Sequence, residues 1–158
     1  MRQAAGIEPH RDPNHHLFSG MLIENAHAWP DDLQAIGAEN DVHYLAFPQG
    51  KGRVRLYLGY SSDQPQRLTG AKGPQAFLDA FRLNSVPLSG ALADATPAGP
   101  CHSYPNEDAW TDEPFAEGMV LIGDAAGWND PIIGQGLSIT YRDVRIVSEI
   151  LRGGGDWS

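Results

Sequence analysis

Cysteine, long apolar runs and basic residues are all scarce in this sequence of 158 residues. The single cysteine, Cys101, excludes an internal disulfide and a cysteine-only metal site, and it gives no sign of an oxidising compartment. No apolar run approaches the length that a membrane-spanning helix needs, and the first residues carry no signal-peptide core. We therefore expect a cytoplasmic protein that does not contact a membrane.

The balance of charge excludes a second class of partner. Eleven Lys and Arg stand against 20 Asp and Glu, which gives a formal net charge of -9. This sign is wrong for coating a phosphate backbone, so we expect no nucleic-acid partner. Between Arg82 and Arg142 the sequence has no Lys or Arg at all. An anion bound in that stretch must therefore be held by backbone groups.

Residues 1–16 are polar and contain three of the six histidines, namely His10, His15 and His16. No carboxylate or cysteine stands beside them at a spacing typical of zinc sites. We therefore predict a flexible leading segment here and assign no metal.

The next part of the chain predicts an antiparallel sheet with short helices. Residues 17–23 form an apolar run typical of a strand, and residues 30–36 begin with a proline that favours one or two helical turns. Residues 73–83 have apolar side chains at helical spacing, which predicts a packing helix. Residues 42–47 and 53–58 flank a glycine-containing turn and are predicted to form a hairpin.

The second strand of that hairpin alternates clearly. Val54, Leu56 and Leu58 fall on one face, whereas Arg55 and Tyr57 fall on the other. The polar face, with His43 on the neighbouring strand, could line a substrate cavity. A solvent-facing side of an antiparallel sheet has the same pattern, and the sequence favours that simpler interpretation.

A strand, a turn and a helix are predicted over residues 118–152. The apolar run 119–122 is typical of a strand covered on both faces, and Gly123 ends it. Asp124 then stands at the carboxyl end of the strand, where ligands bind in open α/β sheets. An ionised carboxylate there accepts hydrogen bonds and suits a ribose-like or ribityl hydroxyl. The alternative is an aspartate that closes its own Asx-turn.

The predicted helix over residues 135–152 has an apolar stripe broad enough to be buried along much of its girth. Pro131 and Gly134 frame the turn before it. Gly134 and Gly136 leave the N–H groups of the first turn without side-chain cover. With the helix dipole, these groups predict a site for an anion or acceptor that needs no Arg or Lys.

Two linked motifs in this region carry a family resemblance. The first is Gly123-Asp124-Ala125-Ala126, and the second is Pro131-x-x-Gly134-Gln135-Gly136-Leu137. In this order and separation they resemble the second flavin fingerprint of the FAD-dependent class A, aromatic-hydroxylase-like monooxygenases, whose relatives include flavin-dependent halogenases and geranylgeranyl reductases. The resemblance is good over residues 118–151, and residues 17–110 are similar in layout to the substrate domain of that family.

The resemblance implies an α+β fold that is part of an FAD/NAD(P)-binding α/β fold. Residues 17–117 would form the antiparallel sheet of a substrate-binding domain. Residues 118–158 would supply the last strand, turn and helix of the FAD-binding domain. The family chemistry implied is insertion of one oxygen atom from O2 into a small organic substrate, with NAD(P)H as the reductant.

The resemblance also assigns roles to residues, although it names no catalytic residue. Asp124, after Gly123, would bond the ribityl or nearby part of FAD. The backbone of the second motif would bind the pyrophosphate and the pyrimidine end of the isoalloxazine, through Pro131, Gly134, Gln135, Gly136 and Leu137.

Three departures from the family pattern set further expectations. The Gly-x-Gly-x-x-Gly motif that binds the ADP half of FAD is absent from the sequence, the middle Asp-Gly motif is not visible, and Gly127 stands where many hydroxylases have His. We therefore expect a carboxyl-terminal portion of a monooxygenase, inactive alone, that binds FAD weakly or not at all. It would self-associate or need a chain that supplies the dinucleotide-binding half. The alternative is a non-catalytic module for a small ligand or a protein that has lost FAD.

Overall fold

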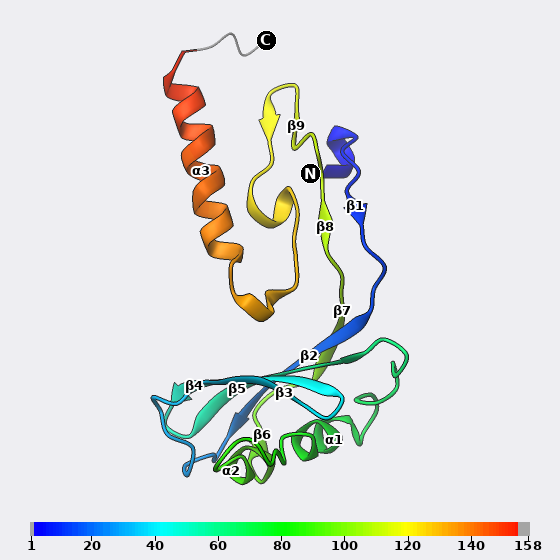
Figure 1. The fold of residues 1–158 in the computed structure, drawn as a ribbon, viewed down its shortest axis with the longest axis vertical. Coiled ribbons are helices and arrows are strands. Elements are labelled where there is room, and N and C mark those ends of the chain that lie inside the picture. Colours follow the sequence, from blue (N-terminus) through cyan, green and yellow to red (C-terminus); the bar gives the residue numbers. More distant parts are fainter. Residues whose placement is uncertain (1, 155–158) are drawn as a thin grey trace. The chain divides into compact units, whose positions relative to one another are not determined.

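The structure is a computed structural model that describes residues 2–154, and these form two compact units (Figure 1). The sheet unit spans His15–Pro105. The terminal unit brings the residues up to Asn14 together with those from Asn106 onward. Within the described range, residues 2–14 therefore fold with residues 106–154, while the assignment of residues 118–158 to an FAD-binding domain stays a prediction.

A six-stranded sheet forms the sheet unit. Its strands follow the order β3-β4-β5-β2-β6, and β7 also pairs with β2. The pairs β3–β4, β4–β5, β2–β5 and β2–β6 are antiparallel. The strands are β2 (His16–Glu24), β3 (Ala35–Glu39), β4 (Val42–Gly50), β5 (Arg53–Ser61), β6 (Thr96–Pro97) and β7 (His102–Asn106).

The predicted hairpin is confirmed as β4 and β5, but its turn is tighter than expected. The strands continue to a two-residue turn at Lys51 and Gly52, with a register shift between Pro48 and Gly50. Both turn residues have positive φ, +57° and +71°, which is the geometry that follows the twist of a tight hairpin. The glycine therefore sits where the turn requires it.

The helical turns predicted over residues 30–36 are wrong. The Leu33 N–H donates to the Pro30 carbonyl in a single turn, and the chain then enters β3 at Ala35. Pairing of β3 with β4 supplies the backbone hydrogen bonds of this segment, so a local helical preference loses to the sheet.

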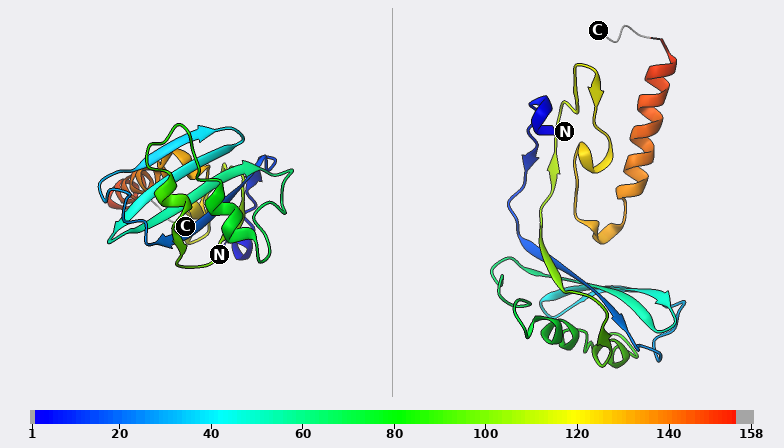
Figure 2. Two further views of the ribbon diagram at one scale, coloured as in Figure 1. Left: turned by 90° about the horizontal axis from the view of Figure 1, so that it is seen from below. Right: turned by 180° about the vertical axis from the view of Figure 1, so that it is seen from behind.

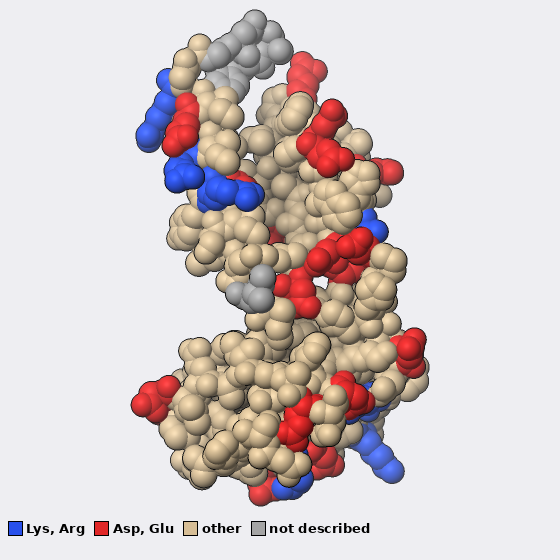
Figure 3. Space-filling view, viewed as in Figure 1, with Lys and Arg blue, Asp and Glu red and all other residues tan. Residues whose placement is uncertain are grey.

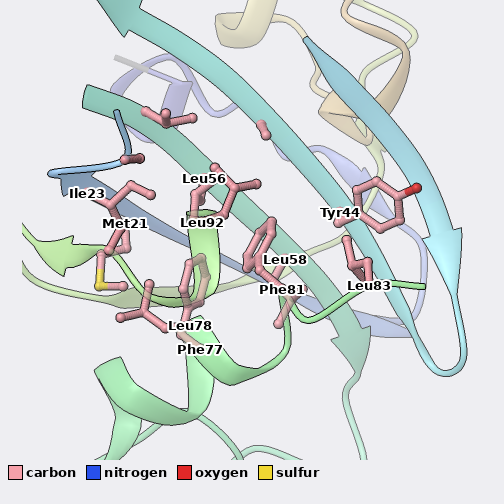
Figure 4. Close-up of a cluster of buried hydrophobic side chains, with 14 of the residues drawn as sticks. Met21, Ile23, Tyr44, Leu56, Leu58, Phe77, Leu78, Phe81, Leu83 and Leu92 are labelled. Carbon is pink, nitrogen blue, oxygen red and sulfur yellow. The ribbon is translucent and has the colours of Figure 1, made fainter. Parts of the chain in front are cut away.

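Two short helices, α1 (Gly73–Asp79) and α2 (Gly90–Ala93), lie on the same face of the sheet (Figures 1 and 2). The helix predicted over 73–83 is therefore confirmed but ends earlier. Phe77 and Phe81 are fully buried, with ring centroids 5.3 Å apart. They pack in one cluster with Leu56 and Leu58 of β5, so the core of the sheet unit lies between the sheet and these helices (Figure 4).

The terminal unit is built from short pairs of strands and one long helix. Strand β1 (His10–Arg11) pairs with β8 (Ala109–Trp110), and β9 (Phe115–Ala116) pairs with β10 (Met119–Val120). The 3-10 turns are η1 (Arg2–Ala5), η2 (Gly123–Ala125) and η3 (Pro131–Ile133). The long helix is α3 (Gly136–Arg152). The leading segment predicted to be flexible therefore contains a helical turn and a paired strand.

The run 119–122 is not the covered strand that the sequence predicts. Only Met119 and Val120 are in strand conformation, and Val120 is 47% exposed although Leu121 is buried. Burial on both faces needs neighbouring strands and a covering layer, and within residues 2–154 only β9 pairs with β10.

Helix α3 has the predicted extent, but its predicted burial is wrong. None of its residues is buried, and Leu137 and Tyr141 are each 67% exposed. The apolar stripe therefore lacks a covering layer among the described residues. A group of basic side chains also lies along this helix (Figure 3). No helix within residues 2–154 is long and apolar enough to cross a membrane.

Candidate functional site

Gly123 is the first residue of η2, shortly after β10, and it contacts the side of α3. Its φ is +54°, and a Cβ at this position would lie 2.5 Å from the Thr140 Oγ1 atom. Its N–H donates to the Asp143 Oδ2 atom at 3.0 Å. Backbone conformation and space both require glycine here, and the hydrogen bond fixes η2 to the side of α3.

Asp143 is a site residue that the sequence analysis missed. Its carboxylate is only 18% exposed and accepts from the Arg142 guanidinium at 2.8 Å as well as from Gly123. Burial alone raises the pKa of this carboxyl, but the bonds from Arg142 and Gly123 outweigh burial and hold the pKa below its usual range. The available signal was a polar pair, Thr140 and Asp143, at the i, i+3 spacing that places two side chains on the same side of a helix.

Asp124 lies on η2 with its side chain exposed. The turn has no side-chain cap, and the Asp124 carboxylate makes no hydrogen bond to any residue between 2 and 154. The Asx-turn alternative is therefore wrong for Asp124. Asp130 behaves in that way instead, because its carboxylate accepts from the Ile132 N–H at 2.9 Å and caps η3. Asp124 is left free to accept from a ligand.

The turn before α3 leaves the start of the helix open. Gly134 has φ +64°, and its N–H donates to the Pro131 carbonyl at 2.9 Å. Gln135 precedes the helix without a capping side-chain bond. The N–H groups of Gly136, Leu137 and Ser138 find no acceptor in the described part of the chain. A Cβ at Gly134 or Gly136 would meet nothing within 4 Å. The positive end of a 17-residue helix is thus uncapped and open to a ligand.

An apolar cleft of about 730 Å³ lies in the terminal unit beside these groups. Gly123 and Gln135 line it, but Asp124, Gly134 and Gly136 do not. Most of its walls are apolar side chains from the β8–β10 region and from α3, including Phe115, Leu121, Ile139 and Ile146. The polar groups of the candidate site therefore lie at the border of an apolar cleft.

Gly127 departs from the family pattern for a steric reason. A Cβ here would lie 2.6 Å from the Ala109 carbonyl oxygen and 2.9 Å from the Trp110 Cα atom. Ala109 and Trp128 exchange two backbone hydrogen bonds of 2.8 Å, which bring the two segments this close. A histidine cannot occupy position 127 without moving this backbone bridge.

The structure brings together two of the three residues predicted on the polar face of the hairpin. The Arg55 guanidinium lies 5.2 Å from the Tyr57 ring centroid. His43 is on the same face but pairs with Gly59 and is exposed. The face is also more aromatic than predicted, because Phe18 stacks on Tyr57 and Phe47 meets its edge. The apolar run of β2, which supplies side chains to both faces, was the signal for Phe18.

Comparison with known proteins gives a family and a fold. The family model described as squalene epoxidase matches residues 12–158. Digeranylgeranylglycerophospholipid reductase 2 of Methanothermobacter thermautotrophicus is 24% identical over 115 residues, which cover 66% of this chain and 24% of that protein.

Solved structures give the same result at the level of the fold. The flavin-dependent brominase Bmp2 superposes with a TM-score of 0.72 at 17% identity, over 99% of this chain and 42% of that one. PqsL of Pseudomonas aeruginosa, a probable FAD-dependent monooxygenase, superposes with a TM-score of 0.73 at 18% identity, over 96% of this chain and 42% of PqsL. HpxO of Klebsiella pneumoniae, solved with FAD and uric acid, superposes with a TM-score of 0.66 at 23% identity, over 96% of this chain and 39% of HpxO.

The α+β fold is thus that of the FAD-dependent monooxygenases and halogenases, and the resemblance read from the two motifs is confirmed. The chain belongs to the squalene epoxidase family. FAD is the cofactor that this family and its structural neighbours indicate. The chain spans 24% of the curated relative and about two fifths of these solved chains.

The residues present fit FAD. FAD carries hydrogen-bond acceptors on its pyrophosphate and on the carbonyl groups of its flavin, and hydroxyl donors on its ribityl chain. The open N–H groups at the start of α3 match the acceptors, and the free Asp124 carboxylate matches a hydroxyl donor. This donor set needs no Lys or Arg, in agreement with their absence between Arg82 and Arg142.

Proposed function

We propose that this chain is part of an FAD-dependent monooxygenase and holds the flavin through Asp124 and the first turn of α3. The observation that carries the proposal is the uncapped start of α3, in a stretch of chain without Lys or Arg and close in sequence to a carboxylate that has no partner in the described protein. The non-catalytic module is the outcome to be tested against it.

The two parts of the site have different tasks in this proposal. Asp124 accepts a hydrogen bond from a ribityl hydroxyl and so orients the cofactor. The N–H groups of Gly136 and Leu137, with the turn from Pro131 to Gln135, hold pyrophosphate and carbonyl oxygens. The positive potential at the start of α3 also stabilises the negative charge that the pyrimidine end gains on reduction.

The reaction proposed is a monooxygenation. FAD supplies the redox chemistry when bound: NAD(P)H provides two electrons, one oxygen atom of O2 enters a small organic substrate, and the other leaves as water. This chain's own residues bind and orient, and none is assigned a proton transfer. The face of the sheet that carries His43, Arg55 and Tyr57 is the proposed contact for the substrate.

The proposed partner is a polypeptide segment that carries a dinucleotide-binding motif. The sequence has no Gly-x-Gly-x-x-Gly for the ADP half of FAD. The apolar cleft and the exposed stripe of α3, which includes Leu137, Tyr141 and Leu151, are the surface it would cover. Sedimentation of the chain alone tests this, because self-association through the same surface is the competing result. A single cysteine is in keeping with a cytoplasmic location, which we also propose.

Equilibrium dialysis against FAD tests the cofactor proposal. Asp124→Ala is expected to weaken binding by one to two decades, the equivalent of a charge-assisted hydrogen bond of about 1.5–3 kcal/mol. Because Asp124 caps nothing, the free energy of unfolding is expected to change by less than about 0.5 kcal/mol.

Glu117→Ala is the matched control for this experiment. Glu117 is an exposed carboxylate in the same unit, outside the two motifs, and its removal should leave FAD affinity unchanged. An equal loss of FAD affinity in Asp124→Ala and Glu117→Ala would mean that the effect comes from net charge alone. Wild-type chain that fails to bind FAD, even with a dinucleotide-binding partner added, would favour the non-catalytic module.

A further inference from the structure

Two histidines approach each other on the face of the sheet that α1 and α2 do not cover (Figure 2). His16 begins β2 and His43 lies on β4, while β5 runs between these two strands. Their ring centroids are 6.3 Å apart and their planes meet at 87°. His16 is half-buried and His43 is exposed, so both imidazoles can be reached from solvent. These two residues are called the histidine pair below.

Gly59 of β5 leaves space between the two rings. It pairs with His43 on one side and with Phe18, two residues after His16, on the other. A Cβ at Gly59 would lie 3.4 Å from the His43 Cβ atom and 3.7 Å from its Nδ1 atom. The His43 ring therefore lies close over bare backbone, and a larger residue at position 59 would fill the gap that the histidine pair spans.

The spacing of the histidine pair is compatible with one shared metal ion. An ion such as Zn²⁺ binds an imidazole nitrogen at about 2.0–2.1 Å, so two rings on opposite sides of one ion have centroids about 6.4 Å apart, and two rings on adjacent sides about 4.5 Å apart. The observed separation of 6.3 Å falls within this range. Because χ2 of histidine is broad, the exposed His43 ring can turn a nitrogen toward the shared position at little cost.

The donor atoms decide which ions the histidine pair can hold. Within residues 2–154 no group of three or more His, Cys, Asp or Glu side chains is placed to hold a metal ion, so water must complete the coordination. Neutral imidazoles bind Zn²⁺, Ni²⁺ and Cu²⁺, whereas Mg²⁺ and Ca²⁺ prefer oxygen ligands. Cu²⁺ binds such nitrogen ligands most tightly of these ions. The net charge of -9 also attracts cations to the chain.

We propose that His16 and His43 form a two-imidazole site for a divalent transition-metal ion, with Cu²⁺ bound most tightly and water in the remaining positions. The site goes beyond the proposed function, because it needs neither FAD nor a substrate. The sequence around His16 predicts no metal, because the second imidazole comes from β4. Only the pairing of β2 and β4 with β5 brings the two rings together.

Titration of the ¹⁵N-labelled chain with Cu²⁺ tests the site by NMR. Below one equivalent, the unpaired electron of the bound ion broadens the amide signals near it, and those of Leu17, His43 and Gly59 should broaden first. Electron paramagnetic resonance of the frozen sample should show two coordinated nitrogens. An excess of Mg²⁺ of about a hundredfold should not displace the Cu²⁺ ion.

His16→Gln and His43→Gln are the decisive variants, and His15→Gln is their matched control. Each decisive variant should weaken Cu²⁺ binding about tenfold or more and leave fewer coordinated nitrogens in the resonance spectrum. His15 is exposed and stands next to His16 but outside the histidine pair, so its replacement should change the affinity by less than about twofold. Amide spectra recorded without Cu²⁺ show that each variant keeps its fold.

The proposal is overturned if either decisive variant binds Cu²⁺ as tightly as the wild-type chain, or if His15→Gln loses the same affinity as they do. It is also overturned if the broadened amides lie away from the start of β2, the start of β4 and the end of β5, or if the wild-type chain shows a single coordinated nitrogen. No FAD enters this titration, so its failure would leave the flavin role of Asp124 untouched.

Discussion

Replacing Gly123 with alanine tests whether η2 packs against α3 as the structure shows. Two costs add at this position. Holding alanine at φ +54° costs about 1–2 kcal/mol, because the left-handed conformation is unfavourable for residues with a Cβ. The new Cβ, 2.5 Å from Thr140 Oγ1, adds overpacking of about 1–3 kcal/mol. Gly123→Ala should therefore lower the free energy of unfolding by about 2–5 kcal/mol.

The steric share can be isolated with Thr140→Ala. Removing the Thr140 hydroxyl and methyl groups leaves the backbone cost but relieves the clash, so Gly123→Ala in this background should cost only about 1–2 kcal/mol. Gly134→Ala is the control. Its φ of +64° carries the same backbone cost, but nothing lies within 4 Å of its Cβ, so it should not couple to Thr140.

Urea unfolding followed by intrinsic tryptophan fluorescence, to which Trp110 and Trp128 of the terminal unit contribute, gives the free energies. Hydrogen exchange of α3 shows whether the helix loosens. Equal costs of Gly123→Ala in the wild-type and Thr140→Ala backgrounds would refute the contact between η2 and α3, and with it the positioning of Asp124 by that helix.

Three further predictions concern the same unit. Gly136→Ala should stabilise the chain by about 0.4–1 kcal/mol, because the position is helical and open, yet it should weaken FAD binding in dialysis by placing a methyl group at the open start of α3. Gly127→Ala should lower the free energy of unfolding by about 1–3 kcal/mol, since its Cβ meets the Ala109 carbonyl. The pKa of Asp143 is lowered by folding, so its stabilisation is present at neutral pH and is lost as the pH falls through the folded pKa. Asp143→Asn should therefore flatten the acid side of a stability curve measured by urea unfolding.

Where local pattern and tertiary packing agree, the sequence predicts the structure well. Val54, Leu56 and Leu58 alternate with polar residues, and the hairpin pairs as expected because that alternation buries one face. The start of α3 was predictable for a similar reason. Pro131, the left-handed Gly134 and Gly136 stand together in the sequence just where the helix begins.

The sequence predicts less where burial depends on segments far away along the chain. The run 119–122 and the stripe of α3 have the composition of covered elements, but within residues 2–154 nothing covers them fully. Residues 30–36 follow the sheet instead of their helical preference. The stacking of Phe18 on Tyr57 was not predicted, because it depends on the register of β2 against β5, which brings the two rings together.

The most direct test of the central claim is an amide-by-amide NMR titration of the labelled chain with FAD. The account predicts that the N–H groups of Gly136, Leu137 and Ser138 shift together with the amide of Asp124, even if the affinity is low, and that Asp124→Ala weakens the whole set of shifts. Amides at the start of α3 that stay unmoved while others respond to FAD, or that respond equally with and without the Asp124 carboxylate, would contradict the account.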